Sequence, residues 1–404
     1  MNISCEHFGR CGGCKYLNIP YEQELDIKKN ALIETLGDYG HLVKTLHPAP
    51  HTSGYRNKME LAFGDEGKDG RLALGMRKQR SFYEVATPEH CVLICDDFKR
   101  VIIYVLEYFC NSGEAFYHRK RHIGALRHLV VRRGEFTGEI LLNLSTTSTL
   151  ATPLEPLVKG LCNLELDGKI VGILHSVNDG VADAIKNENV KLLFGRDYYN
   201  EEISGLKFKV SAFSFFQTNS AGAEKLYDIV KNYAGEHSLP LQTQSALDLG
   251  GNCVRPSTLA YDLYCGTGTI AQILSPHFEK ILGVELIADA IKAAKDNAKL
   301  NSITNCDFYA GDVQAVIREH PATPDVVVVD PPRDGLHPKA LPLIVDLGAP
   351  RLVYVACKPK SLARDLGLLV AAGYTVEKIE GMDMFPRTPH VEAIALLRRN
   401  DRKE

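Results

Sequence analysis

The sequence contains no apolar segment that approaches the ~20 consecutive residues needed to span a bilayer. Charged and polar residues also interrupt every hydrophobic stretch in the first thirty residues, so no h-region of a signal peptide is recognisable there. From these two absences we expect a cytoplasmic protein that has no membrane partner.

An excess of charge of one sign is also lacking. The 47 Lys and Arg residues nearly balance the 50 Asp and Glu residues, which gives a net charge of −3. A nucleic-acid partner must therefore be argued from local patches, and two basic patches exist. Each of them fits either an RNA-binding surface or an ordinary solvated face. The sparser patch comprises Arg71, Arg77, Lys78 and Arg80, and the denser one comprises residues 118–122 (HRKRH) with Arg127, His128, Arg132 and Arg133.

The 404 residues are enough for two or three domains. Residues 1–53 hold a glycine-rich cysteine loop, followed by leucines at the spacing of an amphipathic helix. Residues 54–215 contain short β-like runs between Gly, Asn and Asp turn signals, which predicts a mainly antiparallel β domain with interspersed helices. Strand-like and helix-like segments alternate over 216–404, which is typical of an α/β, Rossmann-like sheet with helices on both faces. Residues 235–258, rich in Ser, Gln, Gly and Pro, are expected to form an exposed insertion.

A glycine-rich turn follows the first strand-like run of the third segment. The sequence DLYCGTGT (262–269) precedes a helix-like stretch, and its glycines let the backbone turn tightly and approach a ligand. Glu285 and Asp312 end the next two strands, where a carboxylate can accept hydrogen bonds from ribose hydroxyls. The third glycine of a dinucleotide-binding turn is missing, which disfavours a nicotinamide cofactor. A similar LDLGG (247–251) lacks a preceding strand and is assigned to the insertion.

Two further strand ends carry candidate catalytic groups. DPPRDG (330–335) follows one strand and Cys357 follows the next, at the edge where open α/β sheets place their ligands. A cysteine there is either a buried structural thiol or a nucleophile whose pKa Lys358 and Arg364 lower. Near the C-terminus, Glu392 supplies a carboxylate that can act as a base.

Four of the eleven cysteines stand in a pattern that the others do not share, and these are Cys5, Cys11, Cys14 and Cys91. In a chain for which we expect no secretion, such spacing favours a metal site over disulfides. Structural zinc and an iron–sulfur cluster both fit four thiolates.

Taken in order, these motifs resemble those of the RNA uridine C5-methyltransferase family, which modifies transfer RNA or large-subunit ribosomal RNA. The resemblance covers nearly the whole chain and rests on FGRCGGC, GYRNKMEL, FSFFQTN, DLYCGTGT, DPPRDGL, ACKPKSLARDL and MFPRTPHVE. It implies that Cys357 is the nucleophile that adds to C6 of a flipped-out uracil, and that Glu392 accepts the C5 proton.

The resemblance also implies ligands. The methyl donor S-adenosylmethionine would contact Gln217, Tyr264, Thr269, Glu285, Asp312 and Asp330. A 4Fe-4S cluster would be held by Cys5, Cys11, Cys14 and Cys91. The central segment, 54–215, would bind the RNA.

The chain departs from the family pattern at three places. Lys358 and Thr269 stand where the family often has Asn. Many members carry an oligonucleotide-binding domain ahead of the cysteines, whereas here Cys5 stands near the beginning, as in the shorter bacterial ribosomal-RNA enzymes. We therefore expect a monomeric 23S rRNA (uracil-C5) methyltransferase.

Transfer RNA uridine stays open as an alternative substrate. A cytosine C5-methyltransferase of RNA would use the same thiolate addition, but it typically has its cysteine beside proline in other sequence settings. A third alternative is an RNA-binding module with an inactive methyltransferase domain, and the intact Cys357 and Glu392 argue against it.

Overall fold

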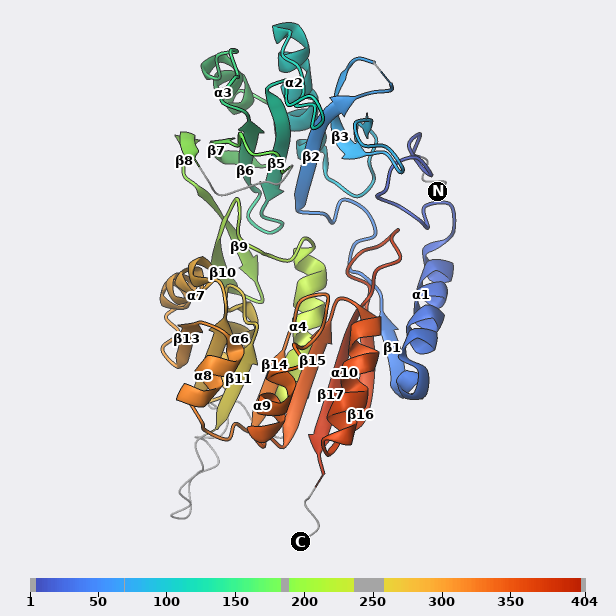
Figure 1. Ribbon diagram of the computed structural model, residues 1–404, viewed down its shortest axis with the longest axis vertical. Helices are drawn as coiled ribbons and strands as arrows, with labels where there is room; N and C mark the ends of the chain where they lie inside the picture. Colours follow the sequence, from blue (N-terminus) through green and yellow to red (C-terminus); the bar gives the residue numbers. More distant parts are fainter. Residues whose placement is uncertain (1–4, 69, 183–188, 236–257, 401–404) are drawn as a thin grey trace.

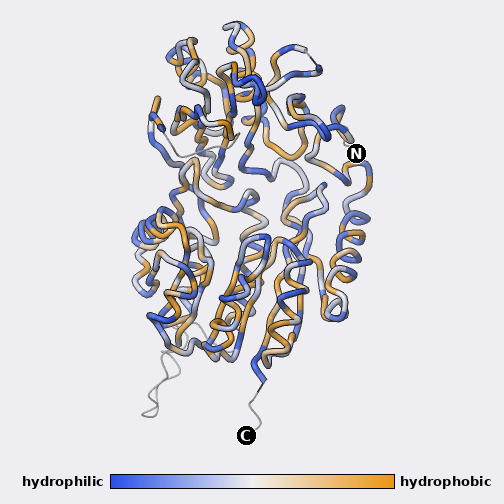
Figure 2. The backbone as a smooth tube through the Cα atoms, in the orientation of Figure 1, coloured by the Kyte–Doolittle hydropathy of each residue, from blue (hydrophilic) through white to orange (hydrophobic). Residues whose placement is uncertain are grey.

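The computed structural model describes residues 5–68, 70–182, 189–235 and 258–400 (Figure 1). Most of the insertion predicted at 235–258, with its LDLGG sequence, therefore lies outside the described residues. Two sheets follow one another along the long axis of the molecule, each with helices packed on it. In Figure 2 hydrophobic residues concentrate along the strands of both sheets, and the outer turns are mostly hydrophilic.

Eight strands form the lower sheet of Figure 1. In spatial order they are β1 (Val43–His47), β16 (Tyr374–Met382), β17 (Glu392–Arg399), β15 (Arg351–Ala356), β14 (Val326–Val329), β11 (Leu259–Leu263), β12 (Lys280–Glu285) and β13 (Cys306–Ala310). β17 is antiparallel to both of its neighbours, and the other pairs are parallel. The four valines of β14 are fully buried and alternate between two cores, one on each face of the sheet.

Helices cover both faces of this sheet, which confirms the predicted α/β, Rossmann-like class. The core on one face contains residues of α4 (Ser220–Gly235), α6 (Thr269–Leu274) and α7 (Ala288–Leu300). The core on the other face contains residues of α1 (Tyr21–Leu36), α8 (Val313–Glu319), α9 (Ala340–Asp346) and α10 (Pro359–Ala371). Among the described helices, none has the length and apolar character that crossing a membrane requires.

Seven strands form the upper, central sheet. In spatial order they are β4 (Val85–Ala86), β3 (Leu72–Arg77), β2 (Lys58–Asp65), β5 (Leu126–Arg133), β6 (Glu139–Thr146), β7 (Lys169–Val177) and β8 (Val190–Gly195). Only β6 and β7 pair in parallel, and α3 (Glu155–Cys162) lies between them in the chain. α3 and α2 (Asp96–Ser112) share one core with this sheet. The hairpin β9 (Tyr198–Ile203) and β10 (Leu206–Ser211) shares a core with α4 and connects the two halves.

The first helix and strand of the chain pack against the lower sheet. β1 pairs in parallel with β16 at the sheet edge, and α1 buries Leu32 and Leu36, as its leucine spacing predicts. α1 also buries Glu24 and Lys28, which hydrophobic spacing does not reveal. The cysteine loop, in contrast, lies beside the central sheet, where Cys11 forms a backbone bridge with Lys78.

Candidate active site

The glycine turn after β11 has the tight backbone that its sequence predicts. Gly266 and Gly268 have φ angles of 54° and 73°, in the region that favours glycine. A Cβ atom at Gly268 would lie 2.6 Å from the ring of Phe308, so only glycine lets α6 begin this close to the sheet. Tyr264 has a φ of 67° without being glycine, which costs about 1–2 kcal/mol. Such strain at a strand end is common at ligand sites.

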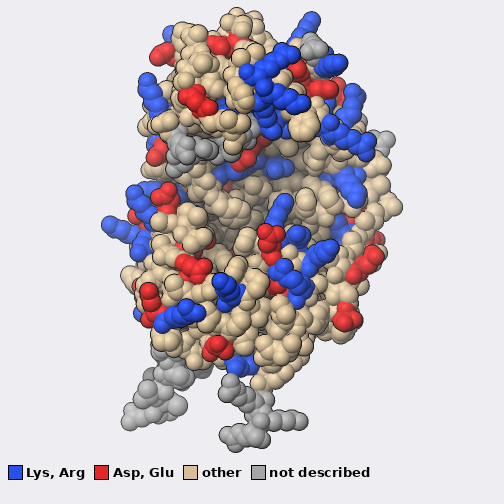
Figure 3. Space-filling model, in the orientation of Figure 1, with Lys and Arg blue, Asp and Glu red and all other residues tan. Residues whose placement is uncertain are grey.

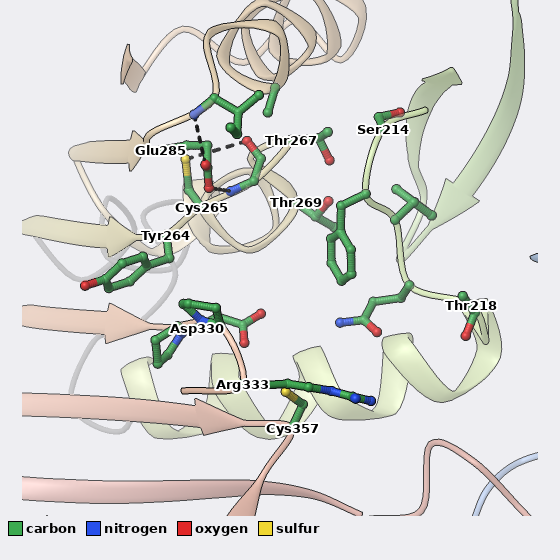
Figure 4. Close-up of a pocket in the computed structure, with 18 of the residues that line it drawn as sticks. Ser214, Thr218, Tyr264, Cys265, Thr267, Thr269, Glu285, Asp330, Arg333 and Cys357 are labelled. Atoms are coloured by element: carbon green, nitrogen blue, oxygen red, sulfur yellow. Dashed lines mark hydrogen bonds between the residues drawn. The ribbon is translucent and has the colours of Figure 1, made fainter. Parts of the chain in front are cut away.

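Carboxylates at neighbouring strand ends accept backbone N–H groups of this turn and of the helices that follow the strands. Glu285 accepts hydrogen bonds from the backbone N–H groups of Gly266, at 3.3 Å, and of Ile287, at 3.0 Å (Figure 4). Asp312 begins α8 and accepts the N–H of Gln314 at 2.8 Å. Asp262 lies in the predicted motif, but its own role was not foreseen. It is fully buried, accepts the N–H of Ala271 at 2.9 Å, and has a pKa raised to about 8 by burial.

The predicted site residues converge on one cleft. This cleft, of about 1990 Å³, lies between the two sheets and appears as the hollow in Figure 3. Its walls include Gln217, Tyr264, Thr269, Glu285, Asp312, Asp330, Cys357 and Glu392. Pockets for one small molecule usually measure ~300–1,000 Å³, so the cleft has room for a second ligand beside a cofactor.

Cys357 lies among carboxyl groups and one cation. Figure 4 shows the Arg333 side chain beside the Cys357 thiol, with Asp330 nearby. Burial raises the pKa of the thiol, Glu392 and Asp330 raise it further, and Arg333 lowers it. Burial also raises the pKa of Glu392 to about 8, with a further contribution from Asp330, and that of Asp330 to about 7. The Cys357 thiol and the Glu392 carboxyl group are therefore mostly protonated near neutral pH, and Asp330 is about half protonated.

The cations that act on the thiol differ from those expected. Lys358 is exposed at the start of α10, and Arg364 pairs with the carboxylate of Asp365 at 2.7 Å. These positions lend no support to the expectation that Lys358 and Arg364 lower the thiol pKa, whereas Arg333, which was not foreseen, lowers it. Arg333 stands in the DPPRDGL motif that follows β14, and β14 is next to β15 in the sheet. This position in the motif could have indicated that Arg333 lies near Cys357.

The four cysteines singled out in the sequence lie near one another, and Cys14 lines the cleft. Burial and then repulsion from Cys91, Cys11 and Cys5 raise the pKa of Cys14 to about 12, so the four thiols are close enough to interact. All four are free and partly buried. A set of unoxidised thiols matches the donor chemistry of an iron–sulfur or zinc site. Nevertheless, within the described part of the chain no three His, Cys, Asp or Glu side chains have ready metal-ligand geometry.

The part of the denser basic patch that lies on β5 proves to be largely interior. Arg127 and Arg132 are almost fully buried. Arg127 donates to the carbonyl oxygen of Gly180 at 2.8 Å, and Arg132 donates to that of Ser214. Arg133 pairs with Asp97 at 3.0 Å. His128 is buried as well. The expectation that Arg127, His128 and Arg132 belong to a surface patch is therefore wrong, because the side chains of β5 are buried from Leu126 to Arg132.

The two turns that stay on the surface lie together. Tyr83 and His118 stack with their ring centroids 4.3 Å apart, which joins residues 118–122 to residues 77–83. Lys120, Arg121 and Arg80 are exposed, and Gln79 lines the cleft. Figure 3 shows Lys and Arg side chains gathered on this part of the central domain. We call residues 77–80 and 118–122 the basic ridge.

Comparison with known proteins gives consistent results. A family model described as tRNA (uracil-5-)-methyltransferase matches residues 317–400, and a general methyltransferase-domain model matches residues 260–338. An uncharacterized RNA methyltransferase of Clostridium tetani is 42% identical over 99% of this chain and 85% of its own length. One from Clostridium acetobutylicum is 44% identical over 98% of this chain and 83% of its own length.

A solved structure is also similar over most of the chain. It is the tRNA (uracil-54, C5)-methyltransferase of Pyrococcus abyssi in complex with S-adenosyl-L-homocysteine. The TM-score is 0.76 at 26% identity, and the match covers 96% of this chain and 86% of that one.

Proposed function

Because this chain belongs to the RNA uridine C5-methyltransferase family and is an S-adenosylmethionine-dependent RNA methyltransferase, we propose that it methylates C5 of a specific uridine in 23S ribosomal RNA. The observation that carries the proposal is the meeting of Cys357 and Glu392 with the glycine turn in one cleft. The motifs are those of a family that modifies ribosomal or transfer RNA, and the trapping experiment below distinguishes the two substrates. The similarity to the Pyrococcus abyssi enzyme favours transfer RNA as a second candidate.

In the proposed reaction the C5 carbon of uracil becomes nucleophilic only after a group adds at C6. The Cys357 thiolate adds there, and the enolate that forms makes C5 reactive. S-adenosylmethionine, held by Gln217, Tyr264, Thr269, Glu285, Asp312 and Asp330, supplies the methyl group. Glu392 then takes the C5 proton, and elimination of Cys357 releases the product. Because C6 is inaccessible in a stacked base, the uridine must flip into the cleft.

Arg333 has a supporting role in this scheme. Arg333 stands beside the thiol and lowers its pKa, which favours the thiolate. Burial and the carboxyl groups of Glu392 and Asp330 act in the opposite direction and raise this pKa. Without this cation the nucleophile would stay protonated more completely at neutral pH.

For the cysteine loop we propose that Cys5, Cys11, Cys14 and Cys91 hold a 4Fe-4S cluster. The chemistry of four neighbouring free thiols supports it. The cluster would order the loop beside the central sheet. Purification without oxygen tests its identity, because a colourless protein that contains zinc and no iron would contradict the proposal.

We further propose that the central domain, residues 54–215, binds the RNA and that the basic ridge contacts its phosphates. The exposed cations of the ridge and its position beside the cleft rim support this role. Phosphate contacts from Lys and Arg supply most of the salt-dependent affinity of such complexes.

The experiment that tests the function uses RNA that contains 5-fluorouridine. Fluorine cannot leave C5 as a proton does, so the enzyme should stall as a covalent adduct with 23S rRNA fragments in the presence of S-adenosylmethionine. The Cys357→Ala variant is the control and should give no adduct. Adducts with tRNA alone would replace the ribosomal substrate by transfer RNA. Trapping of 5-fluorocytidine RNA without trapping of 5-fluorouridine RNA would refute uridine as the substrate.

A further inference from the structure

The segment between β16 and β17 carries part of the cleft wall. Phe385, Thr388 and His390 line the cleft, and Glu392 follows at the start of β17. The segment forms no helix or strand of its own from residue 383 to residue 391. Its conformation must therefore be fixed by contacts with other parts of the chain, or its backbone entropy, ~1–2 kcal/mol per residue, would favour many conformations.

Lys28 of α1 supplies the central contact. Its Nζ atom lies 2.7 Å from the Glu24 carboxylate and 2.8 Å from the Asp383 carboxylate, and it donates to the carbonyl oxygen of Phe385 at 3.1 Å. Tyr21, also on α1, donates to Asp383 at 2.9 Å. Lys28, Glu24 and Asp383 are at most 2% exposed, so these contacts are shielded from water. One lysine thus joins α1 to the beginning of the segment.

Arg387 joins the middle of the segment to the same group of charges. Its backbone N–H donates to Glu24 at 2.6 Å, and its guanidinium lies 3.4 Å from the other oxygen of that carboxylate. Arg387 has a φ of 70°, which a residue other than glycine adopts only when its surroundings impose it. Tyr55 donates to the neighbouring carbonyl oxygen of Pro386 at 3.0 Å.

Arg387 also connects the segment to the cysteine loop. The carbonyl oxygen of Arg387 accepts the backbone N–H groups of Lys15, at 2.7 Å, and of Tyr16, at 3.1 Å. Lys15 follows Cys14 directly and itself lines the cleft. A change in the conformation of the cysteine loop therefore reaches the 383–390 segment through two hydrogen bonds.

Buried ionic groups are a costly way to stabilise a protein, because apolar side chains of similar volume often give equal or greater stability. Buried charged groups do, however, define a geometry, because each of their oxygen atoms and N–H groups needs a hydrogen-bond partner at a fixed position. Two carboxylates, a lysine and an arginine at one junction thus specify one conformation of the segment that precedes Glu392.

We propose that Glu24, Lys28, Asp383 and Arg387 form an ionic clamp that positions the 383–390 segment at the active site and couples it to the cysteine loop, with Lys28 as the central positioning residue. This inference rests on the proposed function, since it assigns the clamp a role in the step that Glu392 catalyses. The clamp residues do not line the cleft, so they act on the reaction only through the segment.

The test compares Lys28→Met with Lys231→Met. Lys231 forms an ion pair of 2.8 Å with Asp228 within α4 and lines neither the cleft nor the clamp, so this control loses a lysine that has no contact with the segment. Hydrogen exchange followed by mass spectrometry reports on peptides that cover residues 15–18 and 383–391. Turnover at saturating RNA and S-adenosylmethionine is measured at a temperature at which both variants are folded.

In Lys28→Met both peptides should lose protection together, and kcat should fall by about 10–100-fold, because small displacements of catalytic groups have effects of this size. The KM for S-adenosylmethionine should stay within about twofold, since its proposed contacts lie on other elements. Lys231→Met should change neither the two peptides nor kcat. If Lys28→Met keeps the protection of 383–391, or keeps the wild-type kcat, the clamp has no positioning role.

If Lys28→Met does not fold, Tyr21→Phe replaces it. This variant removes the hydrogen bond that Tyr21 donates to Asp383 and the one that it accepts from the N–H of Ala49, and it keeps every charge. Protection lost in 383–391 alone would support the clamp, and unchanged protection there would overturn it. Failure of the proposed function is recognised separately, since the wild-type protein would then form no adduct with 5-fluorouridine RNA.

Discussion

Replacement of Glu392 by Gln should separate methyl transfer from product release. Gln keeps the size of this buried side chain but cannot take the C5 proton at neutral pH. Loss of a general base usually costs 10²–10⁴-fold in rate, or about 3–5 kcal/mol. We expect the lower end, about 10²-fold, because the carboxyl group of Asp330 interacts with Glu392, has a pKa of about 7 and can partly substitute.

The step before proton removal should be preserved in this variant. Glu392 raises the pKa of Cys357, so a neutral Gln at this position favours the thiolate. Addition to C6 should therefore proceed at least as fast as in the wild-type protein, and a covalent complex with methylated RNA should accumulate on ordinary uridine.

Denaturing gels and intact mass after rapid mixing measure both steps. The Glu392→Gln variant should form the complex within one turnover and release 5-methyluridine about 10²-fold more slowly than the wild type. Cys357→Ala is the control that forms no complex. Release at the wild-type rate would show that another group removes the proton, and absence of any complex would show that Glu392 acts before methyl transfer.

Three more predictions concern pH, RNA binding and the glycine turn. With a pKa of about 8, Glu392 is roughly one-tenth ionised at pH 7 and half ionised at pH 8, so product release should quicken about fivefold over this interval in stopped-flow assays; a flat profile would contradict this assignment. Arg121→Glu on the basic ridge should weaken RNA binding and lower the salt slope of the affinity by about one in filter-binding titrations. Lys159→Glu on α3 is its control and should leave that slope unchanged. Gly268→Ala should lower the thermal unfolding midpoint more than Gly266→Ala, because a Cβ at Gly268 meets a ring at 2.6 Å whereas one at Gly266 meets nothing within 4 Å; equal midpoints would show that the turn relaxes.

Much of the lower sheet could be predicted because its signals are local. The apolar run of β14 fills a strand that is buried on both faces, and the helix-like stretch after β12 forms α7 (Ala288–Leu300). The carboxyl ends of parallel strands lie at one edge, so strand order alone places Glu285, Asp330 and Cys357 near each other. The meeting of these residues in one cleft follows from that topology.

Burial of charge was much harder to predict. Arg127 and Arg132 are adjacent to His128 and Arg133 in β5, and from sequence alone such basic pairs suggest an exposed basic face. They are buried because their guanidinium groups find backbone carbonyl oxygens of distant loops, at Gly180 and Ser214. These partners are 53 and 82 residues away, so the local spacing of residues cannot reveal them. For the same reason the burial of Lys28 could not be predicted, since its partner Asp383 is 355 residues away.

The environment of Cys357 follows the same rule. Lys358 is its neighbour in sequence, but the chain enters α10 there and the lysine remains exposed. Arg333 is 24 residues away in sequence and yet lies beside the thiol. β14 and β15 are parallel partners, and the end of β14 at Val329 lies opposite Tyr354, two residues before the end of β15. In a parallel sheet the groups that tune a strand-end residue therefore come from the adjacent strand end, and sheet order is a better guide to them than sequence neighbours.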